Sequence, residues 1–388
     1  MLPEYMLAYP TVFAVGSNYN IFVPFDAEVI MWVKVGENVY YDDCNGILRS
    51  NTKMHKVELP MNVLNEACEY TVVYKKMIER RPYYPTSEPA RELTVKFKPV
   101  PNSGNINLYH IADAHNLVAE PIAAGKFWGE ALDLLVLNGD IPNHSGDIKN
   151  FNAICEIASG ITKGQLPVVF ARGNHDDRGI HAEDMPNYIP TMNGRTYYTF
   201  RVGCVWGLLL DCGEDKRDDG DEYGGTICFH QFRLRETEFI KEVIQNAQKE
   251  YAAEGVTHKL IISHIGFTYV DKYPFDIEEE LYSEWAKLMR EHIKPDLLLY
   301  GHYHKVEISK VGSDFDTLGQ PCTAIIGSKP IFDKENGNSF IGCAISLMEN
   351  SKARVVFNDD KGVIHGDEII AKDEKVGYCY DRNNTNNF

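Results

Sequence analysis

The sequence lacks a membrane span and a secretion signal. No stretch of its 388 residues approaches the roughly 18 to 20 uninterrupted apolar residues that cross a bilayer. The first residues, Met1 to Tyr5, show neither the basic segment nor the continuous apolar run of a signal peptide. We therefore expect a cytoplasmic protein without a membrane partner, although a secreted protein trimmed of its signal would look the same.

Cysteine pairs are missing as well. The nine cysteines are an odd number without close spacing, which excludes a recognisable disulfide framework and a zinc-ribbon site. We expect buried, inert thiols in a reducing compartment.

Positive charge is in short supply. Lys and Arg total 39 against 56 Asp and Glu, which gives a net charge of −17. Broad binding to nucleic acid is not expected, because clustered cations are what hold a phosphate backbone. A small phosphorylated substrate stays possible, because a bound metal can meet its charge locally. Nothing in the sequence indicates the oligomeric state.

The hydrophobic pattern divides the chain into two parts. Residues 1–104 contain short alternating runs rich in β-branched and aromatic residues, at 28–35, 69–74 and 93–98. This pattern predicts an all-β sandwich of the fibronectin or immunoglobulin kind. Residues 99–105 hold two prolines and a glycine and are predicted to be a linker.

Strands then alternate with helices through residues 105–375, which predicts an α/β domain. The expected strands are 106–112, 134–137, 166–170, 259–262 and 296–300, with a hairpin over 197–211 and further strands at 322–326, 340–348 and 353–357. The expected helices are 118–131, 147–162, 231–254 and 277–292. Residues 376–388 are expected to form a C-terminal tail.

Metal-binding residue types follow five of these strands, at the point where each strand ends. They are Asp113 and His115, Asp140, Asn174 and His175, His264, and His302 and His304. Because ligands gather at the carboxyl ends of such strands, we expect these side chains to converge at the same edge of one sheet. Imidazole, carboxylate and amide donors without a thiolate suit iron, manganese or zinc, and a carboxylate touching both ions would complete a dinuclear site.

As an ordered set these motifs resemble the calcineurin-like metallophosphoesterase superfamily, over about residues 106–305. The resemblance implies a four-layer αββα domain of two face-to-face sheets with helices outside. It implies that Asp113, His115, Asp140 and His304 hold one metal ion, and that Asp140, Asn174, His264 and His302 hold the other. His175 would act on the phosphoryl oxygens or the leaving group. The implied reaction is hydrolysis of a phosphate mono- or diester by a metal-bridging hydroxide.

The β-sandwich before this domain is similar in arrangement to purple acid phosphatases, but Asn143 stands where they carry a tyrosine ligand. Asn143 also replaces the aspartate with which protein Ser/Thr phosphatases support their catalytic histidine. The purple tyrosinate–iron bond is therefore not expected, and the group that orients His175 is open.

Several assignments keep two readings. Asn143 and His144 could contact substrate or belong to a solvated loop, and Arg178 could bind phosphate or form a salt bridge. The acidic run 215–222 could be a solvated loop or a lid. A second function is also possible, in which the N-terminal sandwich binds a partner and the metal site is vestigial.

Overall fold

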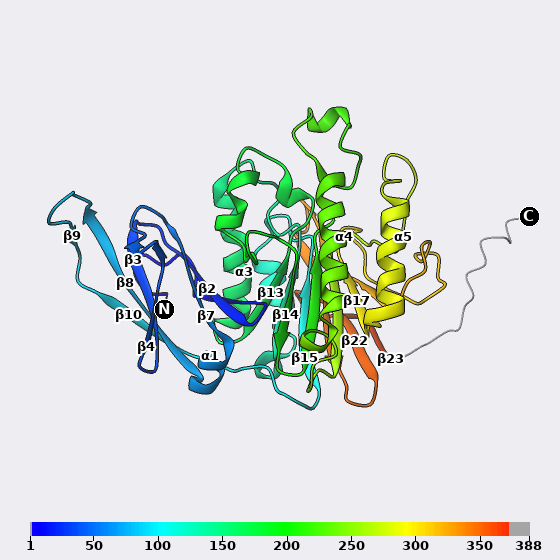
Figure 1. Cartoon of the computed structure of the whole chain (residues 1–388), viewed down its shortest axis with the longest axis horizontal. Helices are drawn as coiled ribbons and strands as arrows, with labels where there is room; N and C mark the ends of the chain where they lie inside the picture. Colours follow the sequence, from blue (N-terminus) through cyan, green and yellow to red (C-terminus); the bar gives the residue numbers. More distant parts are fainter. Residues whose placement is uncertain (1, 372–388) are drawn as a thin grey trace, which may run out of the picture.

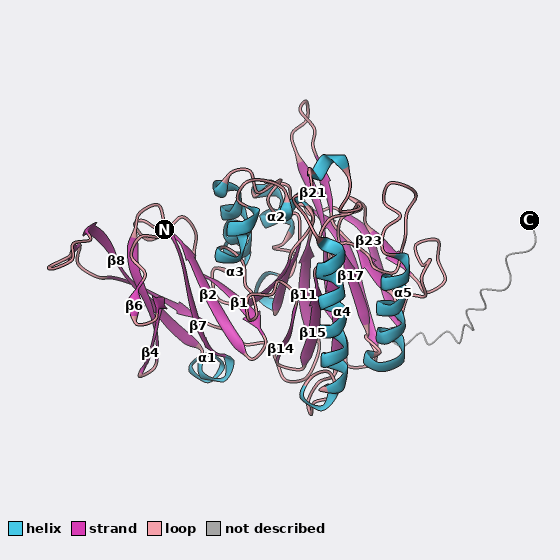
Figure 2. Cartoon of the chain, turned by 45° about the horizontal axis from the view of Figure 1, so that its top comes forward, coloured by secondary structure: helices cyan, strands magenta, loops and turns pink. Residues whose placement is uncertain are grey.

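The computed structural model describes residues 2–371. The tail predicted for 376–388 and Cys379 lie outside this range. Two large sheets and five α-helices dominate the fold (Figures 1 and 2).

The central sheet has ten strands and carries the first three predicted site motifs. Its order is β23 (Ile364–Ala371), β22 (Lys352–Asp359), β21 (Ser339–Leu347), β11 (Ile106–Ile111), β12 (Leu134–Asn138), β13 (Pro167–Ala171), β1 (Thr11–Val15), β2 (Asn18–Pro24) and β7 (Met54–Pro60), with β20 (Lys329–Ile331) beside β21. Strands β11, β12 and β13 are parallel to one another.

A second sheet of six strands carries the remaining two motifs. Its order is β14 (Tyr198–Val202), β15 (Val205–Leu210), β16 (His258–Ser263), β17 (Leu297–Tyr300), β19 (Ala324–Ile326) and β18 (Glu307–Ser309). The α-helices are α1 (Met61–Ala67), α2 (Ala119–Ala124), α3 (Asn152–Thr162), α4 (Phe229–Gln245) and α5 (Glu279–Leu288). Shorter 3₁₀ turns occupy Gly129–Ala131, Ile148–Phe151, His175–Asp177, Ala182–Asn187, Asp221–Tyr223 and Ala247–Lys249, and a π-helical turn occupies Met289–Ile293.

Alternation of side chains along the strands builds three cores between four layers. On β12, Leu134 and Val136 pack between the two sheets, whereas Leu135 and Leu137 pack against α3. On β16, Ile261 points the other way and joins the core under α4 and α5. The predicted αββα architecture is therefore confirmed, with α2 and α3 on one outer face and α4 and α5 on the other (Figure 1).

The N-terminal region is β-rich, as predicted, with one short helix, α1. It forms a five-stranded sheet in the order β10 (Arg91–Lys96), β8 (Glu69–Glu79), β3 (Val29–Val35) and β4 (Asn38–Tyr41), with β9 (Thr86–Ser87) beside β8. A small ribbon pairs β5 (Asp43–Cys44) with β6 (Ile47–Leu48). The β8–β9 end projects from the molecule (Figure 1).

The central sheet contains strands from both sides of the expected linker. Strand β1 pairs in parallel with β13, with Val12 opposite Pro167 and Phe13 opposite Val168. Strands β2 and β7 then extend the sheet outward. Backbone hydrogen bonds therefore join the parts of the chain before and after the expected linker, which independent domains would not need. The domain boundaries expected at residues 104 and 375 stay predictions.

Two predicted helices end earlier than expected, and a third changes from an α-helix to a π-helical turn. The helix expected over 118–131 stops at Ala124, because Gly125 follows and Gly129 takes a left-handed conformation (φ +53°). The helix expected over 231–254 stops at Gln245, where the Asn246 side chain donates to the Glu242 carbonyl. The helix expected over 277–292 gives way to the π-helical turn after Leu288.

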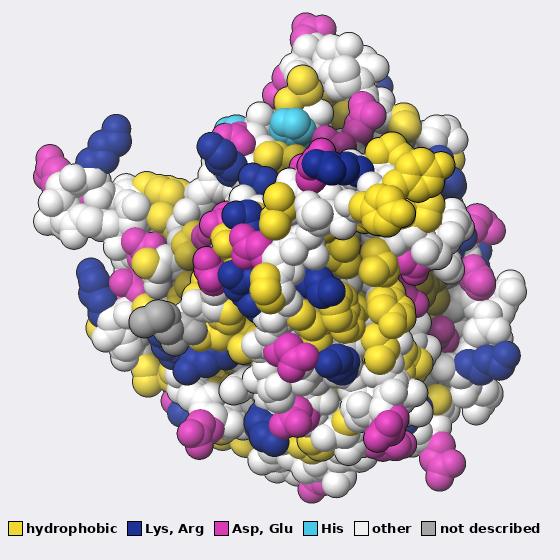
Figure 3. All heavy atoms as spheres, turned by 90° about the vertical axis from the view of Figure 1, so that its left-hand side faces the viewer, with side chains coloured by type: hydrophobic (Ala, Val, Ile, Leu, Met, Phe, Trp, Pro, Cys, Tyr) yellow, Lys and Arg dark blue, Asp and Glu magenta, His cyan; other side chains and the backbone are white. Residues whose placement is uncertain are grey.

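The burial of the cysteines differs partly from the expectation of buried thiols. Of the eight cysteines within 2–371, five are buried, whereas Cys44, Cys68 and Cys228 are exposed, and all eight are free thiols. No helix in this range is both long and apolar enough to cross a bilayer. On the face shown in Figure 3, basic side chains are interspersed with acidic ones, and hydrophobic side chains gather near the centre.

Candidate metal centre

The predicted ligands meet beyond the carboxyl ends of their strands, but these strands belong to two sheets rather than one. Asp113, Asp140 and Asn174 follow strands of the central sheet, and His264 and His302 follow strands of the second sheet. The expectation of a single sheet edge is therefore wrong. The strands point the same way in both sheets, so face-to-face packing brings the two sets of strand ends together.

Asn138, the last residue of β12, connects the sheets beneath the site. Its side-chain amide donates to the carbonyl oxygens of Ser263 and Leu299, at 3.1 and 3.2 Å. The backbone carbonyl oxygen of Asn138 accepts from His264 Nδ1 at 2.6 Å. The proton of His264 is therefore on Nδ1, and its Nε2 is directed toward the predicted ligands.

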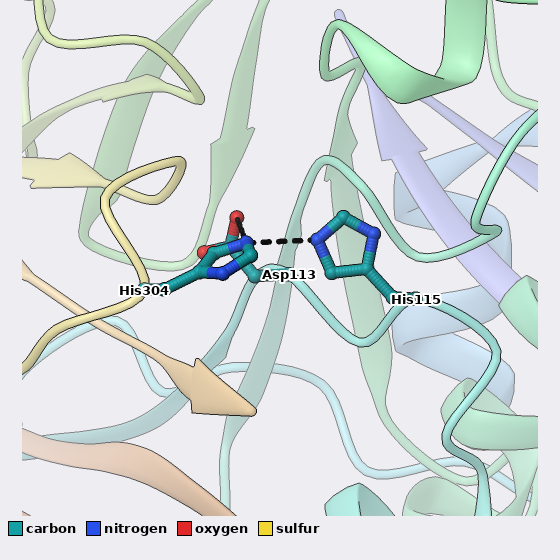
Figure 4. Close-up of side chains that lie close together, drawn as sticks. All are labelled: Asp113, His115 and His304. Atoms are coloured by element: carbon teal, nitrogen blue, oxygen red, sulfur yellow. Dashed lines mark hydrogen bonds and ion pairs between the residues drawn. The ribbon is translucent and has the colours of Figure 1, made fainter. Parts of the chain in front are cut away.

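A first group of ligand atoms comprises Asp113, His115 and His304. His115 Nε2 lies 2.9 Å from His304 Nε2, and His304 Nε2 lies 3.5 Å from Asp113 Oδ1. Figure 4 shows a nitrogen of each imidazole ring directed toward the other ring, with the Asp113 carboxylate beside them. These are three of the residues predicted to hold one ion.

A second group comprises Asp140, His264 and His302. His264 Nε2 lies 3.1 Å from Asp140 Oδ2, and His302 Nδ1 lies 3.1 Å from Asn174 Oδ1. Asp140 Oδ2 is also 4.0 Å from His115 Nε2, in the first group. The same oxygen thus faces both groups, which is the position required of a bridging ligand.

These separations fit cation coordination. Ligand bonds of about 2.1 Å place neighbouring ligand atoms about 3.0 Å apart in an octahedron and about 3.4 Å apart in a tetrahedron. The observed 2.9, 3.1 and 3.5 Å lie close to these values. Moreover, His264 Nε2 is buried and makes no hydrogen bond within the described residues, so it is placed to bind a metal ion once its proton is displaced. The donor set therefore fits a metal ion.

Backbone strain is concentrated at the same residues. Five of the seven predicted ligands have left-handed backbone conformations: Asp113 (φ 56°), His115 (44°), Asp140 (53°), His302 (70°) and His304 (47°). Such conformations cost on the order of 1 kcal/mol or more for residues other than glycine, and they persist where function requires them. Gly139 (φ 78°) adds a close approach, because a Cβ there would lie 2.6 Å from the His264 ring.

Burial and mutual charge shift the pKa values of the ligands in opposite directions. Burial lowers the pKa of His115 and of His302 to about 4, so both are neutral donors at pH 7. Burial raises the pKa of Asp113 to about 8. Burial opposes charge on Asp140 and His264 too, but their attraction lowers the pKa of Asp140 and raises that of His264 to about 10.

His175 lies beside both groups, and its orientation is set by the backbone. Its Nδ1 donates to the carbonyl oxygen of Asn143 at 2.8 Å, and its own backbone N–H donates to Asp140 Oδ1 at 2.8 Å. Because a carbonyl only accepts, Nδ1 carries the proton, and Nε2 accepts from Arg178 Nη1 at 3.1 Å. A carbonyl thus orients His175 in place of the carboxylate sought in the sequence. His175 also forms a third possible ligand group with His115 and Asp140.

Arg178 is held by acidic residues of the loop after β15. Its Nε and Nη2 donate to the two carboxylate oxygens of buried Glu214, at 2.7 and 2.6 Å, and Nη2 lies 3.4 Å from Asp215. Asp215 Oδ2 is in turn 3.8 Å from His302 Nε2. Asp215, the first residue of the acidic run 215–222, therefore lies within the site. Sequence reasoning missed Glu214, whose only signal was its place beside this run, whereas Asp215 belongs to the run for which a lid was one of the two interpretations.

Asp176 was also missed, although it lies within the Gly-Asn-His-Asp motif. One of its oxygens accepts from the backbone N–H groups of Gly173, at 2.7 Å, and of Asp140, at 3.2 Å. It thereby holds the two motif turns together. His144, by contrast, accepts from the N–H of Gly146 in its own exposed loop, and the side chain of Asn143 is exposed. Contact of either with substrate stays a prediction.

Comparison with known proteins agrees with this geometry. The family model for calcineurin-like phosphoesterases matches residues 106–306, just over half of the chain, whereas no curated protein matches the sequence. The fold is similar to that of a purple acid phosphatase from yellow lupin (Lupinus luteus) seeds, with a TM-score of 0.62 and 15% identity over 94% of this chain and 74% of that one. It is also similar to PhoD, with a TM-score of 0.51 and 12% identity over 96% of this chain and 90% of that one. The matched motifs and the fold agree, and the chain belongs to the calcineurin-like phosphoesterase family.

Proposed function

We propose that the protein is a dinuclear metallophosphoesterase that hydrolyses a small phosphate mono- or diester. One ion would be held by Asp113, His115, Asp140 and His304, and the other by Asp140, Asn174, His264 and His302. Iron, manganese or zinc suits this donor set. When bound, two such ions supply a hydroxide nucleophile at neutral pH and neutralise the phosphoryl oxygens.

The observation that carries this proposal is the position of Asp140. Its Oδ2 lies 3.1 Å from a nitrogen of one ligand group and 4.0 Å from a nitrogen of the other. Its Oδ1 accepts from the backbone of His175, and its own backbone is held by Asp176. These contacts fix the carboxylate, so that the free oxygen is directed between the two groups.

His175 is proposed as the catalytic residue. With its Nδ1 proton committed to Asn143, only Nε2 can meet a substrate. A proton on Nε2, in place of the hydrogen bond from Arg178, makes His175 a donor to the phosphoryl or leaving oxygen. Arg178 lies against the same nitrogen and is proposed to contact the phosphoryl group. Its pairing with Glu214 fixes the direction of the guanidinium.

Hydrolysis of para-nitrophenyl phosphate and bis-para-nitrophenyl phosphate tests the proposal, with added Mn²⁺ and again after chelation. We expect turnover of at least one ester with metal present and its loss on chelation. Absence of turnover of both esters, together with absence of bound metal by elemental analysis, would contradict it.

A further inference from the structure

A cavity of about 260 Å³ adjoins the metal centre. Metal-ligand candidate His302 forms part of its wall, together with Tyr269, Phe275, Ile277 and Tyr303. A group held in this cavity could therefore be attached to a phosphate positioned at the centre. Accordingly, the cavity is placed to receive the alcohol portion of a phosphate ester, and its chemistry bears on the substrate.

Two tyrosines form a rigid corner of the cavity. The rings of Tyr269 and Tyr303 lie 6.0 Å apart at 79°. Phe315 stacks on Tyr269, at 4.2 Å and 15°, and meets Tyr303 edge to face at 4.6 Å. The Tyr303 hydroxyl accepts from the backbone of Gly266 at 3.2 Å. Because these contacts fix the rings, their arrangement does not depend on a ligand.

The remaining charge of the cavity is negative. Asp215 and Asp271 are part of the wall, and none of the described residues that line it is lysine or arginine. Asp215 is compensated by Arg178 and by Lys216, at 3.4 and 3.5 Å. Asp271 is exposed and forms no ion pair with a residue in the described range. It accepts from the backbone N–H of Lys272 and interacts with the Tyr269 hydroxyl, and neither group carries a positive charge to match its own.

Aromatic rings beside an unmatched carboxylate are the environment that an organic cation prefers. The negative faces of tyrosine and phenylalanine attract ammonium groups, and quaternary ammonium ligands are recognised in this way. One such contact already exists at the rim, where Lys216 Nζ lies 5.3 Å from the centre of the Phe275 ring. An anionic group, such as a further phosphate, would instead meet the two carboxylates.

We propose that this cavity binds a positively charged amino or quaternary ammonium group, and that the substrate is a phosphate ester of an amino alcohol. This inference rests on the proposed phosphoesterase function. Asp271 and Tyr269 are the specificity-determining residues, with Asp271 meeting the charge and Tyr269 presenting a ring to it.

Two esters of the same shape test the inference: phosphocholine and its neutral carbon analogue, 3,3-dimethylbutyl phosphate. The kcat/KM of the intact protein with Mn²⁺ is expected to be about tenfold higher for phosphocholine. Asp271→Asn and, separately, Tyr269→Leu are expected to reduce this preference to about twofold or less. Asp276→Asn, an exposed carboxylate of the same loop outside the cavity wall, serves as the control and should keep it.

The possible outcomes separate this inference from the proposed function. Equal kcat/KM for the two esters in the unsubstituted protein, or an unchanged preference in both cavity variants, would overturn the amino-alcohol assignment while leaving a phosphoesterase. Failure to hydrolyse these two esters and both nitrophenyl esters would overturn the proposed function, and this inference with it.

Discussion

At the scale of residues, the hydrogen bonds of His175 favour a role in catalysis over a role as a metal ligand. Its Nδ1 is committed to the Asn143 carbonyl, and its Nε2 accepts from Arg178. Replacing His175 with Ala is therefore expected to lower kcat by about 100- to 10,000-fold without changing the metal content. Steady-state kinetics and elemental analysis of the same preparation check both parts.

The control for this variant is His292→Ala, which removes an exposed imidazole from the π-helical turn after α5. It should leave kcat and metal content unchanged. Loss of metal from the His175→Ala protein would instead place His175 in the coordination shell, as its proximity to His115 and Asp140 permits.

The ligand pKa values predict how metal binding depends on pH. At pH 7 the metal-free protein holds protons on Asp113, whose pKa is raised to about 8, and on His264, whose pKa is raised to about 10. His115 and His302, with pKa values of about 4, hold none on their ligand nitrogens. Filling both sites must displace the first two protons, so affinity should rise as pH increases from 6 to 8.

Calorimetric titration with Mn²⁺ at pH 7, in two buffers of different ionisation enthalpy, measures this release. We expect about three protons per chain, one each from Asp113 and His264 and one from the water that would supply the hydroxide nucleophile. Binding without proton release, or affinity that falls as pH rises, would show that Asp113 and His264 are not ligands in the protonation states inferred.

At the scale of elements, Asn138 joins β12 to the ends of β16 and β17. Asn138→Ala would leave the buried carbonyl oxygens of Ser263 and Leu299 without this donor. We expect a loss of about 2 to 4 kcal/mol in the free energy of unfolding, measured by urea denaturation.

Asn18→Ala provides the comparison, because among residues 2–371 the Asn18 amide donates only to exposed Glu58. Its effect should stay within about 0.5 kcal/mol. Equal effects of the two variants would indicate that the amide beneath the site does not bind the two sheets together.

The strands and their terminal motifs could be predicted, because each apolar run ends in a short polar segment that is visible locally. The division of the strands between two sheets could not be inferred from the alternation of strands and helices, which indicates only that the strands are buried. The same limit applies to β1: nothing near Val12 indicates that its partner is Pro167. Glu214 looked like a loop residue because its partner, Arg178, is 36 positions away.

At the scale of the whole molecule, the N-terminal strands complete the central sheet. Removing residues 1–104 would expose the backbone edge of β13 and open the core shared by Val12, Val29, Val72 and Val136. Residues 105–388 expressed alone are therefore expected to aggregate or to lack a cooperative unfolding transition by circular dichroism. A soluble fragment with the activity and melting temperature of the full chain would show instead that residue 104 ends an independent domain.

The number of ions needed for turnover tests the central claim, a dinuclear phosphoesterase centre, most directly. The measurement is titration of the chelated protein with Mn²⁺ while hydrolysis of bis-para-nitrophenyl phosphate and bound metal are followed together. The shared position of Asp140 predicts that activity returns fully only at two ions per chain. Full activity at one ion per chain, or activity that survives chelation unchanged, would contradict it.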